Sequence, residues 1–257
     1  MTPPLVKLDS VGKRFGHGPG GGTQALAAVN LTIARGEFLA ILGPSGCGKS
    51  TLLRLLAGLA QPSSGTLHWS APPGPRDIGF VFQEATLLPW ADTLTNTALP
   101  LRLAGTPQPE REARAAAALA AVGLAGFERS LPRELSGGMR MRVSIARALV
   151  TNPAVLLMDE PFAALDELTR HKLNDDLLAL YARAGVTVVF VTHSVSESVY
   201  LASRVIVMAP RPGRIARELL IASPSPRPEG FRTSVGYAEL CRDASLALAE
   251  GLAEGVA

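Results

Sequence analysis

The stretch GPSGCGKST, residues 43–51, contains three glycines and ends in one lysine and two hydroxyl-bearing residues. Its spacing matches GxxxxGK[ST], in which the glycines let successive backbone N–H groups point inward at a phosphate chain. An apolar run precedes it at 37–42, and leucines follow at helical spacing over 51–59, which predicts strand, loop and helix. The helix start adds a partial positive charge. We therefore predict a nucleotide-binding loop here rather than a plain glycine turn.

Two side chains of this loop have predicted roles. Lys49 is expected to reach the outer phosphates, and the hydroxyl of Ser50 is expected to coordinate Mg²⁺. The other residues expected to contact the nucleotide are Gly43, Pro44, Ser45, Gly46, Cys47, Gly48 and Thr51.

Composition limits the class of protein. The chain has 257 residues, of which 47% are hydrophobic, and a net charge of +3. No apolar run approaches the roughly 18 residues of a transmembrane helix, and no basic region followed by an apolar stretch opens the sequence. We therefore expect a cytoplasmic protein without a secretory signal. The small charge favours neither nucleic acid nor an anionic membrane as a partner, and Cys47 and Cys241 are expected to be reduced thiols.

Apolar β-rich runs alternate with helical patterns, which is typical of a parallel sheet flanked by helices. Three stretches that alternate more loosely are expected to form an antiparallel patch beside this core. These are residues 5–15, 25–34 and 64–69. The predicted core strands are 37–42, 77–82, 155–159, 186–191 and 204–209.

A helical insertion is expected between the second and third core strands, over about 84–150. Within it, a helix is predicted to begin at Pro109 and to end at Gly123, supported by Glu110 four residues before Arg114. Two segments are expected to be irregular because they are rich in glycine, proline and serine. They are the loop 16–24 and the linker 223–230, which precedes a helix-like tail.

A pair of acids follows the predicted strand at 155–159. Asp159 stands at the carboxyl end of this strand, where ligands of open α/β sheets bind. Such acids could simply cap the next helix, but the phosphate loop upstream favours a catalytic pair. Asp159 is then expected to hold Mg²⁺ through water, and Glu160 to polarise an attacking water beside the γ-phosphate.

The stretch LSGGMRMRVSIARAL, residues 135–149, predicts a helix with a second anion site at its start. Ser136 is a natural N-cap, and Gly137 and Gly138 leave the first N–H groups open. An ordinary capped helix is the alternative interpretation.

Six motifs in one order resemble the ATP-binding subunit of ABC transporters. Along the chain they are GPSGCGKST, Gln83 after GFVF, LSGGM, LLMDEP, AALD at 163–166, and His193 after VFVT. The resemblance covers about residues 1–220, and few other P-loop proteins carry LSGG followed by DEP. It implies an α/β fold with a P-loop NTPase (RecA-like) core, an antiparallel β edge subdomain and an inserted helical subdomain. The ATP-binding domain is then expected at 1–222 and a short tail at 223–257.

The same resemblance implies roles for four further residues. Phe15 resembles the aromatic that stacks on adenine, with a place in the core as the alternative. Gln83 resembles the residue that touches Mg²⁺ and the attacking water, and His193 resembles the γ-phosphate switch. Asp166 resembles the aspartate that crosses a dimer interface. The family's signature usually has glutamine where Met139 stands. We expect this difference to affect the fine tuning of the signature and not nucleotide binding.

The stretches 87–101 and 159–170 resemble ATPases of importers for nitrate, sulfonates and taurine, a group that also serves pyrimidine-precursor uptake. This implies an ATP- and Mg²⁺-dependent homodimer, peripheral on the cytoplasmic face of the bacterial inner membrane. Its partners would be integral permease subunits and, indirectly, a periplasmic or lipid-anchored solute-binding protein, with no nucleic acid. An exporter motor, a soluble ABC ATPase acting on DNA or ribosomes, and a P-loop kinase are the alternatives.

A possible contact with the permease lies just after Gln83. Leu87, Leu88 and Trp90 are large apolar residues in a segment too irregular for a core strand, which predicts an exposed docking patch. The alternative is that Trp90 packs under the helical insertion.

Overall fold

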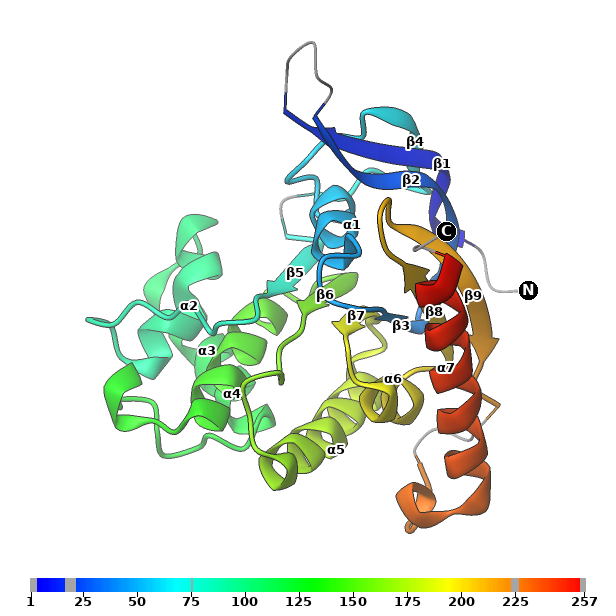
Figure 1. Ribbon diagram of the computed structural model, residues 1–257. Coiled ribbons are helices and arrows are strands. Elements are labelled where there is room, and N and C mark those ends of the chain that lie inside the picture. The colour runs from blue at the N-terminus through cyan, green and yellow to red at the C-terminus, as the bar shows by residue number, and fades with distance from the viewer. Residues whose placement is uncertain (1–3, 17–21, 75, 223–226, 255–257) are drawn as a thin grey trace. The chain divides into compact units, whose positions relative to one another are not determined.

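The computed structural model describes residues 4–16, 22–74, 76–222 and 227–254 (Figure 1). The chain forms two compact units, one of Met1–Pro72 with Thr187–Ala257 and one of Pro73–Val186. Most of the predicted loop at 16–24, with His17, and part of the predicted linker at 223–230 lie outside the described residues.

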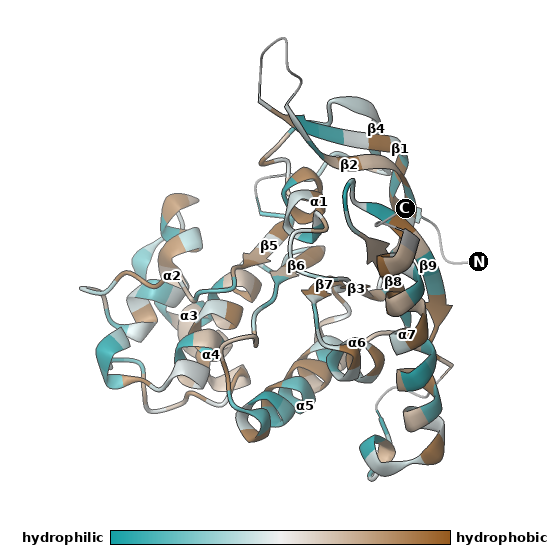
Figure 2. Ribbon diagram, in the orientation of Figure 1, coloured by the Kyte–Doolittle hydropathy of each residue, from teal (hydrophilic) through white to brown (hydrophobic). Residues whose placement is uncertain are grey.

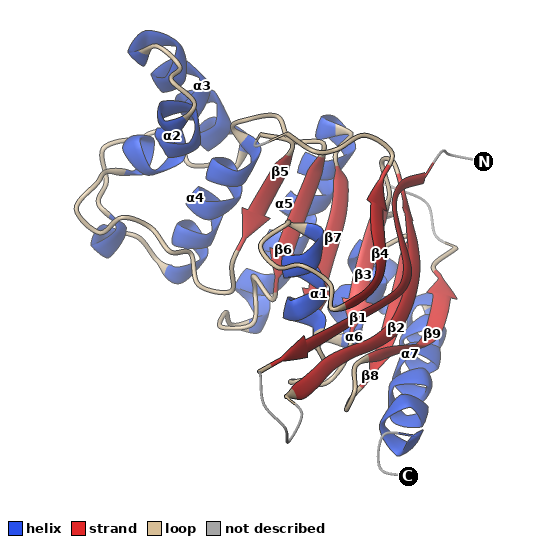
Figure 3. Ribbon diagram, turned by 90° about the horizontal axis from the view of Figure 1, so that it is seen from above, coloured by secondary structure: helices blue, strands red, loops and turns tan. Residues whose placement is uncertain are grey.

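The first unit contains an antiparallel sheet of three strands (Figure 3). These are β1 (Pro4–Phe15), β2 (Thr23–Ala34) and β4 (Ser64–Trp69), in the order β2-β1-β4. Leu8 of β1 pairs with Leu31 on one side and with Leu67 on the other. The predicted antiparallel patch is therefore confirmed.

The same unit contains a group of mainly parallel strands in the order β7-β3-β8-β9. Their bounds are β3 (Phe38–Leu42), β7 (Thr187–Thr192), β8 (Arg204–Ala209) and β9 (Arg214–Leu220). Strand β3 runs parallel to both β7 and β8 and is buried throughout, as expected for a continuous apolar run in a parallel sheet. Strand β9, which the sequence did not predict, pairs antiparallel with β8.

The helices of the first unit are α1 (Lys49–Leu56), α6 (Val195–Leu201) and α7 (Val235–Glu254), with a 3₁₀ turn, η2 (Phe231–Thr233). Hydrophobic and hydrophilic segments alternate along α7 (Figure 2). Its buried side includes Ala244 and Ala247, and a Cβ on Gly251 would lie 3.1 Å from the Cβ of Ala216 in β9. Small residues thus let α7 pack closely on the strand.

In the second unit, β5 (Ile78–Val81) runs parallel to β6 (Val155–Asp159). The helices are α2 (Thr93–Leu103), α3 (Gln108–Ala121), α4 (Gly137–Leu149) and α5 (Glu167–Ala184), with a 3₁₀ turn, η1 (Pro132–Glu134). The helix predicted at 109–123 is confirmed as α3: its Glu110–Arg114 ion pair measures 3.3 Å, and Gly123 beyond its end has a φ of 73°. The limits proposed for the helical insertion and for the ATP-binding domain stay predictions.

Two further expectations concern the whole chain. Both cysteines lie in the described ranges, and neither Cys47 nor Cys241 forms a disulfide. Among the described helices, none combines the length and the hydropathy needed to span a bilayer.

Candidate functional site

The predicted phosphate loop connects β3 to α1 in the first unit. Gly48 has a left-handed backbone, with φ 98°, and a Cβ there would lie 2.6 Å from the Leu26 side chain. A Cβ on Gly43 would lie 2.7 Å from the sulfur of Cys47. The left-handed backbone therefore requires glycine at 48, and the close approach of Cys47 requires glycine at 43.

Lys49 begins α1 and is buried, with only 4% of its surface exposed. Its ammonium donates hydrogen bonds to the carbonyl oxygens of Gly43, at 2.7 Å, and of Pro44, at 3.0 Å. Ser50, the predicted Mg²⁺ ligand, follows in the first turn of the helix and is half-buried. The loop thus holds its one cation against its own backbone, where the phosphate chain is predicted to bind.

His193 lies beside this loop in the fold. Strands β3 and β7 are parallel, and Leu42 at the end of β3 pairs with Thr192 at the end of β7. Gly43 and His193 therefore leave adjacent strands at the same edge, and the His193 side chain is exposed. The first unit brings together two segments that are 150 residues apart in sequence.

Phe15 closes β1 with 45% of its surface exposed, and the Lys13 ammonium lies 5.2 Å from the centroid of its ring. The alternative that Phe15 belongs to the core is therefore wrong. An exposed ring at this position is compatible with stacking on a base.

Two histidines that match no motif lie elsewhere in the described residues. His68 is exposed, and His171 is 4.0 Å from Glu167.

In the second unit, two further predicted site segments also follow adjacent parallel strands. Val81 near the end of β5 pairs with Met158 in β6, so the chain toward Gln83 and the chain at Asp159 leave adjacent parallel strands. Glu160 follows with φ 45°, a left-handed conformation that is uncommon for a residue other than glycine. Gln83 is exposed, while Asp159 and Glu160 are half-buried.

The acids after β6 do not cap a helix. Helix α5 begins at Glu167, and its N-cap is Asp166, whose carboxylate accepts a hydrogen bond from the Thr169 N–H at 2.9 Å. That bond lowers the pKa of Asp166. The capping alternative for Asp159 and Glu160 is therefore wrong.

Ser136 is the N-cap of α4, as predicted. Its hydroxyl accepts a hydrogen bond from the Met139 N–H at 3.2 Å. A Cβ on Gly138 would lie 2.9 Å from the Thr169 methyl group, whereas Gly137 is exposed. Glycine at 138 thus lets the start of α4 lie against the first turn of α5, close to Asp166.

Two residues that sequence reasoning missed hold the segment after Gln83. Asn96 of α2 is fully buried and donates from its amide nitrogen to the carbonyl oxygens of Leu88, at 3.1 Å, and Ala91, at 2.9 Å. Arg147 of α4 donates to the carbonyl oxygens of residues 85 and 86 at 2.8 and 2.9 Å. No local pattern in the sequence marked either residue, because each acts by donating to backbone carbonyl groups of another segment.

Trp90 is 77% exposed, so the alternative that it packs under the insertion is wrong. Leu87 and Leu88 are half-buried beside it. In the same unit a groove of about 320 Å³ is lined by β5, α2, α4 and the chain that follows β5, and its lining includes the exposed Phe82 and Leu103. The second unit therefore presents an apolar surface next to Gln83.

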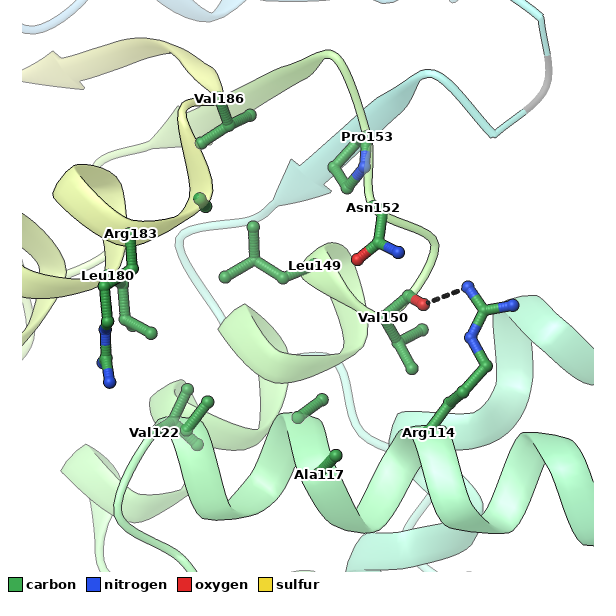
Figure 4. Close-up of a pocket in the computed structure, with 13 residues that line it drawn as sticks. Arg114, Ala117, Val122, Leu149, Val150, Asn152, Pro153, Leu180, Arg183 and Val186 are labelled. Atoms are coloured by element: carbon green, nitrogen blue, oxygen red, sulfur yellow. Dashed lines mark hydrogen bonds between the residues drawn. The ribbon is translucent and has the colours of Figure 1, made fainter.

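A larger cavity, of about 500 Å³, lies among α3, α4 and α5 (Figure 4). Arg114 at its edge donates a hydrogen bond to the Val150 carbonyl oxygen at 2.9 Å. Pro153, which lines it, precedes the amino end of β6, whereas Asp159 is at the carboxyl end of that strand. None of the predicted site residues, all within the described ranges, lines this cavity, so it is not the candidate site.

Comparison with known proteins identifies the family. The family model described as ABC transporter matches residues 26–163, more than half of the chain. The chain belongs to the ABC transporter family. A putative ATP-binding protein of Brucella abortus is 46% identical, and the match covers 92% of this chain and 90% of that protein. The taurine import ATP-binding protein TauB of Pseudomonas syringae pv. tomato is 47% identical, and the match covers 84% of this chain and 82% of TauB.

A solved structure of this family supports the same assignment. The ATP-binding cassette MJ0796, in a dimeric post-hydrolysis state bound to ADP and Pi, matches with a TM-score of 0.73 and 36% identity. The match covers 85% of this chain and all of that one. This member of the ABC transporter family is therefore an ATPase with the α/β fold of P-loop NTPases, as the motifs predicted. The roles of individual residues stay predictions.

Proposed function

We propose that this ABC-family ATPase powers the import of a small solute through a separate membrane permease. The observation that carries the proposal is the pairing of strand ends. In the first unit the phosphate loop and His193 follow the ends of two paired strands, and in the second unit Gln83 and Glu160 do so. The relatives named for taurine import support an importer over an exporter, and a nitrate, sulfonate, taurine or pyrimidine-like compound would be the solute.

The working form is a homodimer that encloses two ATP molecules. The dimeric state of the cassette MJ0796 supports this. One chain would contribute its phosphate loop, Gln83, Glu160 and His193 to each site, and the other chain Ser136 and Gly138 at the start of α4. An open helix start carries unpaired N–H groups and a partial positive charge, which suit a phosphate.

The residues expected to hold Mg²⁺ fit that ion. Ser50, Gln83 and Asp159 offer hydroxyl, amide and carboxylate oxygens, the donor class that Mg²⁺ prefers. When bound, the ion would neutralise charge on the phosphates. Glu160 would accept the proton of the attacking water, Gln83 would orient that water, and His193 would contact the γ-phosphate.

Replacement of Lys49 by Ala tests the nucleotide site. We expect the affinity for ATP, measured by calorimetry, to fall about tenfold or more, because a charge-assisted hydrogen bond to phosphate is lost. ATP hydrolysis by the purified chain should fall with it. Lys7→Ala, which removes a lysine whose side chain is 62% exposed on β1, is the matched control and should leave both unchanged. Equal affinities in the two variants would contradict the proposed nucleotide site.

The apolar surface after Gln83 is the proposed contact with the permease. It consists of Leu87, Leu88 and Trp90, and the groove lined by Phe82 and Leu103 lies in the same unit. Because Asn96 and Arg147 fix the backbone between Gln83 and Trp90, a permease helix seated on this surface would be coupled mechanically to Gln83. The kind of partner that fits is an amphipathic helix with an apolar face.

The double variant Trp90→Ala with Leu88→Ala tests this contact. We expect the isolated subunit to stay folded and to hydrolyse ATP, but its recovery with the permease to weaken and solute uptake to be lost. Leu220→Ala, an equally apolar substitution at a residue that is 72% exposed on β9, should leave uptake intact. A lower melting temperature with permease binding retained would show that the residues serve stability and that docking occurs elsewhere. Trp90→Ala alone decides the matter if the double variant does not fold.

A further inference from the structure

His193 stands in a turn that is closed by hydrogen bonds between β7 and α6. The Thr192 hydroxyl donates to the Glu197 carboxylate at 2.5 Å and accepts from the Ser194 N–H at 2.9 Å. Ser194 is the N-cap of α6, and its hydroxyl accepts from the Glu197 N–H at 3.3 Å. The backbone position of His193 therefore depends on where α6 lies.

The far end of α6 is held by Arg227. Its guanidinium donates to the carbonyl oxygens of Tyr200, at 2.8 Å, Ala202, at 2.7 Å, and Val199, at 3.4 Å. The last carbonyl groups of a helix lack partners within the helix, and a cation at this end also interacts favourably with the helix dipole. Arg227, distant in sequence, thus caps the C-terminus of α6.

The near end of α6 is held by Tyr237 in the first turn of α7. Its hydroxyl donates to the Ser196 carbonyl oxygen at 3.0 Å, and the Ser196 hydroxyl lies 2.9 Å from that of Ser194. Burial raises the pKa of Tyr237, with the neighbouring Cys241 as a further cause, so the phenol keeps the proton that it donates. This contact reaches the turn that contains His193.

Aromatic packing joins these two contacts into one surface. The Phe231 ring is buried between Tyr200 of α6, at 6.1 Å between centroids, and Tyr237, at 5.2 Å in an edge-on arrangement. The Arg232 guanidinium lies 3.4 Å from the centroid of the Tyr200 ring. Residues 227–237 therefore contact α6 near both of its ends, at Ser196 and at Val199 and Tyr200.

We propose that the C-terminal segment, residues 227–254, positions the switch residue His193 by clamping both ends of α6 through Arg227 and Tyr237. Neither residue touches nucleotide in this scheme, so both are positioning residues. The inference rests on the proposed function, because it takes His193 as the group that contacts the γ-phosphate. It assigns to the tail a part in the hydrolysis step itself rather than in nucleotide binding.

Arg227→Ala and Tyr237→Phe test the clamp, with ATP hydrolysis and ATP affinity as readouts in the full chain. Misplacement of a reacting group by a fraction of an ångström to one ångström costs up to about a hundredfold in rate, so we expect kcat to fall about tenfold in Arg227→Ala and about threefold in Tyr237→Phe. The KM for ATP should stay unchanged, because the phosphate loop is not altered. Tyr237→Phe keeps the ring packing and removes only the hydroxyl. Arg242→Ala, at an exposed arginine of α7, is the matched control.

A second comparison separates positioning from general loss of structure. In a His193→Ala background, Arg227→Ala should lower kcat no further, because residues that act through one another are not additive. A further drop of the same size in that background would overturn the clamp, as would an unchanged kcat in Arg227→Ala alone. If His193→Ala itself leaves hydrolysis intact, the role given to His193 under the proposed function fails instead.

Discussion

Replacing Glu160 with glutamine should leave ATP binding intact and lower turnover by about two orders of magnitude, the usual range for loss of a general base. Glutamine has nearly the same shape, so the substitution removes the basic oxygen and little else. The position supports the role, because Glu160 directly follows β6, the strand whose partner β5 leads to Gln83. Turnover and nucleotide affinity should be measured on the same preparation.

The control for this variant is Glu167→Gln. Glu167 lies in the first turn of α5, and its side chain is 81% exposed. It carries the same charge only seven residues away, so a general effect of charge would appear in both variants. Hydrolysis retained in Glu160→Gln would remove Glu160 from the role of base.

Replacing Ser136 with arginine should abolish hydrolysis, because the long side chain would fill the anion site at the start of α4. Met139→Gln should change hydrolysis by no more than a few-fold, since the serine hydroxyl and the open N–H groups remain. Both rates are measured as steady-state ATP hydrolysis at a protein concentration that favours the dimer.

Loss of the N-cap must be separated from blockage of the site. Ser136 caps α4 through the Met139 N–H, and loss of such a cap costs about 1 kcal/mol of stability. Ser136→Ala loses the cap without filling the site and should retain measurable hydrolysis. Comparable losses in Ser136→Arg and Met139→Gln would mean that the side chain at 139 is itself a main contact.

Buried parallel strands were the part of the fold that could be predicted best. Strands β3 and β6 are continuous apolar runs next to chemical motifs, so their place and type follow from hydrophobicity alone. Strand β9 was missed because it is half-exposed and carries two arginines and a glutamate within RIARELL. Its strand character comes from pairing with β8, which no local pattern records.

The motifs likewise predicted which residues are candidates for the site but not what holds them. The strand, loop and helix around Lys49 follow from spacing, whereas Asn96, Arg147 and Arg227 act through contacts with backbone carbonyl groups outside their own elements. In the sequence, any polar residue could donate to many backbone carbonyl groups. Only the folded structure shows which of these groups it contacts. For Trp90 the sequence left two alternatives, because apolarity alone does not distinguish core from interface.

The left-handed backbone at Glu160 bears on how this ATPase could be engineered. For a residue with a side chain, that conformation costs roughly 1 kcal/mol of stability, whereas glycine adopts it without this cost. With Glu160 as the proposed base, a library of variants selected only for resistance to heat would gain stability from Glu160→Gly and lose ATP hydrolysis at the same step. Under that proposal, stability and activity favour different residues at this one position, so a thermostable version of the ATPase would have to gain its stability elsewhere in the chain.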